Sequence, residues 1–131
     1  MSKQPYDIKE RTFEFGVRII KLVNAMPRTV AGIELGRQVV RSGTSVGANV
    51  EEADGATTRK EFAYKVGISR KEARETRFWL RLIQATGLLE SPDIPVLIDE
   101  SDQLVRILST IIKNAEREIR EERTMYEMTN D

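Results

Sequence analysis

Residues 41–83 decide the fold, and they read RSGTSVGANVEEADGATTRKEFAYKVGISRKEARETRFWLRLI. Near the middle of this stretch, Gly55 is placed to end one helix. Thr58 and Glu61 have the spacing of a capping box, which predicts that a second helix begins there. Extended along the chain in both directions, the stretch predicts helices over about residues 31–54 and 59–86, joined by a short loop.

Two further helices are predicted outside this stretch. Residues 7–25 begin with a capping-box pattern and carry two neighbouring apolar seams, which together are wide enough for a bundle core; the second seam is Phe13, Gly16, Ile20 and Val23. Residues 94–123 carry a heptad-like seam of Leu, Ile and Ala, and residues 124–131 are expected to fray.

Helices of similar length with short connections are typical of an antiparallel arrangement. We therefore predict an all-α fold, an up-and-down antiparallel four-helix bundle that forms a single domain over residues 1–131. The helix predicted at 31–54 contains Gly32, Gly36, Gly43 and Gly47, each of which costs about 1 kcal/mol relative to alanine in a helix interior. Close approach of a neighbouring helix backbone is the expected compensation.

The composition excludes several kinds of chemistry. The 131 residues include no cysteine and no histidine, and 21 Lys and Arg balance 21 Asp and Glu. Thiolate nucleophiles, Cys-based zinc sites and His-based triads are therefore impossible, and a di-iron bundle would need Glu-x-x-His pairs. We predict no catalytic residue, no metal and no cofactor. The lack of a long apolar run predicts a cytoplasmic protein without membrane contact.

A basic stripe runs along the helix predicted at 59–86. Residues 59–81 carry eight basic and three acidic side chains. At 100° per residue, five arginines fall within one narrow sector, namely Arg59, Arg70, Arg74, Arg77 and Arg81. Two interpretations stay open: the arginines bind the phosphates of a nucleic acid, or they pair with acidic residues of the next helix or of another subunit.

The rest of the same helix is apolar around most of its circumference, which favours a second buried surface and hence a homo-oligomer. Candidate interface residues are Phe62, Phe78 and Trp79, although Phe78 and Trp79 could instead stack on a nucleobase. Charged residues within this apolar arc predict a structural network of buried ion pairs. Its candidate members are Arg41, Asn49, Glu52, Glu72 and Glu75.

A family resemblance rests on two runs of residues. Ser45, Asn49 and Glu52 form the first, and the second is KEARETRFWL at residues 71–80. These runs resemble the four-helix-bundle family named for 23S rRNA intervening sequences, also called S23 ribosomal proteins. The resemblance implies a protomer of a ring-shaped homopentamer. It also implies kinship with the accessory subunit of diversity-generating retroelements, which binds nucleic acid and a reverse transcriptase.

Two functions follow as expectations. The first is a non-enzymatic, homo-oligomeric accessory protein that binds RNA or DNA and, by the resemblance, a protein such as a reverse transcriptase. The second is a protein-interaction scaffold that binds no nucleic acid.

Overall fold

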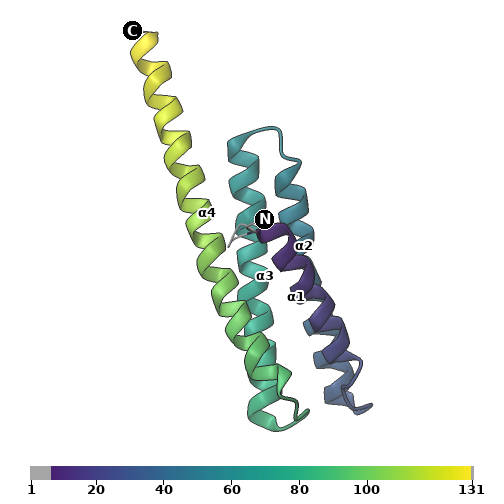
Figure 1. Cartoon of the computed structure of the whole chain (residues 1–131). Helices are drawn as coiled ribbons and strands as arrows, with labels where there is room; N and C mark the ends of the chain where they lie inside the picture. Colours follow the sequence, from purple (N-terminus) through teal and green to yellow (C-terminus); the bar gives the residue numbers. More distant parts are fainter. Residues whose placement is uncertain (1–6, 131) are drawn as a thin grey trace, which may run out of the picture.

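The computed structural model describes residues 7–130 as four α-helices (Figure 1). The helices are α1 (Ile8–Val23), α2 (Val30–Asp54), α3 (Arg59–Thr86) and α4 (Asp93–Thr129). Helices that follow each other in sequence pack side by side, so α3 lies between α2 and α4. This all-α arrangement is consistent with an up-and-down bundle.

The helix ends follow the capping signals of the sequence. The Asp7 side chain accepts a hydrogen bond from the Glu10 amide, and the Thr58 hydroxyl accepts one from the Glu61 amide. Gly87 ends α3 in the left-handed conformation with φ 66°, which glycine adopts without a steric penalty. The predicted bounds of α3 are therefore confirmed.

Helix α4 is longer than the sequence predicted. Residues 124–129, expected to fray, continue the helix to Thr129, while Asp131 lies outside the described residues. A helix that has already formed grows without a further nucleation cost, and the Glu and Met of this segment favour helix. The end of α4 projects past the α2–α3 connection (Figure 1), and its side chains from 120 to 130 are exposed.

The core draws on all four helices. Its largest fully buried side chains include Phe15 and Ile19 of α1, Val39 and Val46 of α2, Leu80 and Ile83 of α3, and Leu97, Leu104 and Leu108 of α4. Helix α1 packs mainly on α2 and meets α4 only sparingly. A two-pronged ion pair crosses between α1 and α4, in which Arg11 Nε and Nη2 each donate to Glu100 over 2.8 Å.

Glycines let α1 approach α2 closely, as predicted. A Cβ atom at Gly43 would stand 2.8 Å from Ile19 Cγ2, and one at Gly47 would stand 3.1 Å from the carbonyl oxygen of Thr12. The helix-propensity cost of these glycines is thus offset by close packing of the two helices.

Candidate nucleic-acid interface

Three of the five predicted arginines of α3 reach toward α4. Arg59 Nε lies 3.2 Å from Glu118 Oε2, Arg70 Nη1 donates to Ser109 Oγ over 3.3 Å, and Arg77 Nε lies 3.8 Å from Asp102 Oδ1. The residue numbers of the α4 partners rise as the residue numbers of the α3 arginines fall, as in an antiparallel pair of helices. These contacts tie the two helices together along the predicted basic stripe.

The other two arginines, Arg74 and Arg81, are exposed. Neither has a carboxylate within 4.0 Å among the residues that the structure describes. Both stand on the α4-facing side of α3, one helical turn from Arg70 or Arg77. They are therefore available to an external anion.

Helix α4 adds cations to the same edge. Asp102, Arg106, Ser109 and Lys113 follow each other at steps of four, three and four residues, so they share one side of α4. The Asp102 carboxylate accepts a hydrogen bond from Arg106 Nη2 over 2.8 Å and also faces Arg77. One carboxylate is thus shared between two arginines, and the edge keeps an excess of positive charge.

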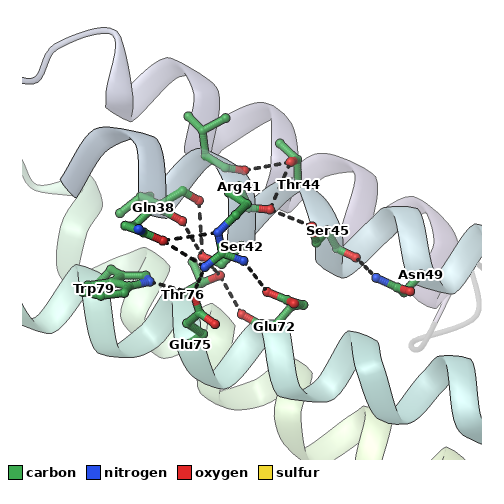
Figure 2. A network of polar contacts seen from close by, with 12 residues as sticks. Gln38, Arg41, Ser42, Thr44, Ser45, Asn49, Glu72, Glu75, Thr76 and Trp79 are labelled. Carbon is green, nitrogen blue, oxygen red and sulfur yellow. Dashed lines mark hydrogen bonds and ion pairs between the residues drawn. The ribbon is translucent and has the colours of Figure 1, made fainter. Parts of the chain in front are cut away.

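A polar network joins α2 to α3, as Figure 2 shows. Arg41 Nη1 lies 3.3 Å from Glu72 Oε1, and Arg41 Nη2 pairs with Glu75. Gln38 Oε1 accepts from Arg41 Nη2 over 3.0 Å, and Trp79 Nε1 donates to Glu75 Oε2 over 3.1 Å. These contacts join α2 to α3 through Glu72 and Glu75.

Two predicted members take no part in the ion pairs of Arg41. Asn49 Nδ2 donates to the Ser45 carbonyl of its own helix over 2.8 Å, and Glu52 lies 3.7 Å from Lys65 Nζ. Deeper between the helices, the hydroxyls of Thr76 and Ser42 are hydrogen-bonded over 2.8 Å, and both residues are fully buried. Sequence reasoning missed this hydroxyl pair because Ser and Thr carry no charge that would mark them in an apolar arc.

The three candidate interface residues differ in position. Phe62 packs against the core with the Arg59 guanidinium 5.0 Å from its ring centre, and Trp79 is half-buried. Phe78 is 52% exposed and meets the edge of Trp79, with ring centres 5.2 Å apart at 70°. Of the three, Phe78 presents the most surface to another molecule.

Comparison with known proteins places this fold and these residues in a family. The sequence model of the 23S rRNA-intervening sequence protein matches residues 4–110. The chain belongs to that family. A solved structure from Bacteroides thetaiotaomicron, a protein with unknown function from the S23 ribosomal protein family, is similar. Its identity is 34% and its TM-score 0.72, over 81% of this chain and 95% of that chain. No curated protein matches the chain.

The chain also has an apolar groove that the sequence did not reveal. The groove, of about 380 Å³, runs between α1 and α2. Phe13, Val17 and Ile20 line it, and Phe13 is 64% exposed. The second seam of α1 was interpreted as bundle core; this was wrong for Phe13 and Ile20, because Gly43 and Gly47 draw α2 against the other seam and leave them outside.

Two cations of α1 have raised pKa values. The hydrogen bond to Asp54 raises the pKa of Lys9, and the hydrogen bond to Glu100 raises the pKa of Arg11. Residues 7–130 contain no group of three or more acidic side chains placed to hold a metal ion. No helix in the described part of the chain is long and apolar enough to cross a membrane.

Proposed function

We propose that this member of the family is a non-enzymatic, homo-oligomeric protein that binds nucleic acid along the α3–α4 edge. The observation that carries the proposal is the exposure of Arg74 and Arg81 without an ion-pair partner in the described residues, beside Arg70, Arg77 and Arg106. These side chains are the ones that would meet phosphates.

Local charge supports this proposal better than the net charge of the chain does. The whole chain is formally neutral, but phosphates respond to the cations within a Debye length, about 8–10 Å at physiological salt. The planar guanidinium group binds a phosphate through two parallel hydrogen bonds. In a ring, symmetry would repeat this edge once per subunit and multiply its contacts.

The groove between α1 and α2 supports the oligomeric part of the proposal. Monomeric proteins seldom leave large apolar side chains grouped on the surface, and grouped ones mark an interaction site. We propose that a second copy of this chain covers Phe13 and Ile20, and by the family resemblance that five copies close a ring. The heterologous contact that builds such a ring needs two different surfaces per subunit, and the α1–α2 groove supplies one of them.

The alternative function is a protein-interaction scaffold without nucleic-acid binding. It is favoured by the ion pairs that occupy Arg41, Arg59 and Arg77 within the subunit. In that case Arg74 and Arg81 would contribute to solubility or to a protein partner.

A binding experiment with charge reversal tests the proposal. Fluorescence anisotropy of labelled RNA and DNA is measured with the wild type and with Arg74→Glu/Arg81→Glu, while light scattering records the oligomer in the same buffer. The control is Arg117→Glu/Arg123→Glu, which makes the same charge change on exposed residues of the α4 end. The proposal predicts loss of binding in the first variant alone. Equal loss in both would exclude a localised site, and no binding by the wild type would favour the scaffold.

A further inference from the structure

Two exposed aromatic rings lie on the outer face of α3. Tyr64 is 67% exposed and Phe78 is 52% exposed. Together with Lys71 between them, they are spaced by seven residues, so all three lie on one side of the helix. The buried residues of α3, which include Ala73 and Leu80, lie on the opposite side. The two rings therefore face away from the core.

Cations lie along the same face as the two rings and on its α4 side. Lys60 and Lys71 share the outer face, and Arg74 and Arg81 border it on the side of α4. None of the four has a carboxylate within 4.0 Å in the described part of the chain. The face thus combines flat apolar surfaces with unpaired positive charge.

The acidic residues of α3 lie on its other border, toward α2. These are Glu61, Glu72 and Glu75. Arg41 pairs with both Glu72 and Glu75, so one of these two negative charges is offset. The polar network between α2 and α3 thereby limits the negative charge at this border of the outer face.

The same network also positions one of the rings. Glu75 Oε2 accepts the hydrogen bond of Trp79 Nε1 over 3.1 Å, which fixes the indole. The indole meets Phe78 edge to face, with centres 5.2 Å apart. Phe78 is therefore supported from one side and open on another, so a planar group can stack on it without first ordering the ring.

From this combination we propose that the outer face of α3 binds unpaired bases of single-stranded nucleic acid, which stack on Tyr64 and Phe78. Lys60, Lys71, Arg74 and Arg81 bind the phosphates from the outer face and from its border with α4. The proposal rests on the nucleic-acid binding proposed above and names its substrate class. Duplexes are disfavoured because their bases are already stacked and paired, and exposing one costs a few kcal/mol.

The length of the face fits a short strand. Phe78 lies fourteen positions after Tyr64, so the two are separated by about 21 Å along the helix at about 1.5 Å per residue. At about 3.4 Å per stacked nucleotide, this length corresponds to about six nucleotides. Single-strand binding domains that combine aromatic rings with a basic surface cover about 4–16 nucleotides.

The experiment compares single strands with duplexes. Labelled oligonucleotides of about twelve nucleotides, within the usual range of site sizes, are titrated as RNA, as DNA of the same sequence and as duplexes of each. The variants are Tyr64→Ala/Phe78→Ala, which removes both rings and keeps every cation, and Tyr64→Phe/Phe78→Tyr, which keeps both rings. The control is Met125→Ala/Tyr126→Ala, which trims equally exposed side chains at the end of α4.

Loss of one stacked base lowers affinity by about tenfold, so removing both rings should weaken single-strand binding by about a hundredfold. Duplex binding should change by less than about twofold, because phosphate contacts carry it. The exchanged rings and the control should retain wild-type affinity. Unchanged single-strand affinity without the rings would overturn this inference, while the charge-reversal result could still uphold phosphate binding. If no strand binds the wild type, both proposals are wrong.

Discussion

Replacing Gly43 with alanine should destabilise the protein, although alanine is the better helix former. The new Cβ would stand 2.8 and 2.9 Å from two side-chain atoms of Ile19. Ile19 is fully buried and branched at Cβ, so it has little freedom to rotate away, and α1 must shift from α2. Overpacking of this kind costs about 1–3 kcal/mol.

The higher helix propensity of alanine stabilises the variant by about 1 kcal/mol. The net loss in the free energy of unfolding should therefore be about 1 kcal/mol and at most about 2 kcal/mol. Gly67→Ala is the matched control: it lies inside α3, and a Cβ there would meet no atom within 4 Å. The control should gain about 1 kcal/mol, because only propensity changes.

Urea unfolding followed by far-UV circular dichroism measures both variants at one protomer concentration, since oligomers are more stable when concentrated. The two midpoints should move in opposite directions with unchanged slopes. If Gly43→Ala stabilised the protein as much as Gly67→Ala, the close packing of α1 on α2 would be refuted.

Three further predictions concern α1 and α4. Arg11→Met should lower the free energy of unfolding in urea by about 1–3 kcal/mol, because it leaves the mostly buried Glu100 carboxylate unpaired. Adding Glu100→Gln to this variant should recover part of the loss. If the losses of the two substitutions were additive, the pairing would be contradicted. Phe13→Asp/Ile20→Asp should dissociate the oligomer, as measured by light scattering. The stability of the subunit should change by less than about 1 kcal/mol, since both side chains are exposed. An intact oligomer would exclude the α1–α2 groove as its interface. Ending the chain after Glu118, which keeps the pair with Arg59, should change the free energy of unfolding by less than about 1 kcal/mol; a larger loss would show that the end of α4 has a partner.

The helix starts could be predicted from the sequence because the signals that set them act between neighbouring residues. Asp7 and Thr58 each cap an amide three residues away, so capping chemistry alone placed the starts of α1 and α3. The end of α4 was predicted wrongly: fraying was expected because chain ends are usually poorly ordered, but the helix continues to Thr129 although its last side chains are exposed.

Contacts between helices depend on register, which the sequence does not contain. The basic stripe identified Arg74 and Arg77 together, yet only Arg77 meets an acid of α4, because Asp102 happens to lie opposite. For the same reason the sequence offered several candidate carboxylates as partners of Arg41 but did not decide between them. The outward position of Tyr64 became clear only once the core side of α3 was known.

The most direct test of phosphate binding by α3 is the salt dependence of single-strand affinity. Four cations are proposed to neutralise one phosphate each, namely Lys60, Lys71, Arg74 and Arg81. A plot of the logarithm of the association constant against the logarithm of the salt concentration should then fall with a slope of about 2.8 per subunit. Arg74→Gln/Arg81→Gln should reduce that slope to about 1.4, since two of the four contacts are lost. A slope that is the same in both proteins, or binding that does not depend on salt, would contradict the account.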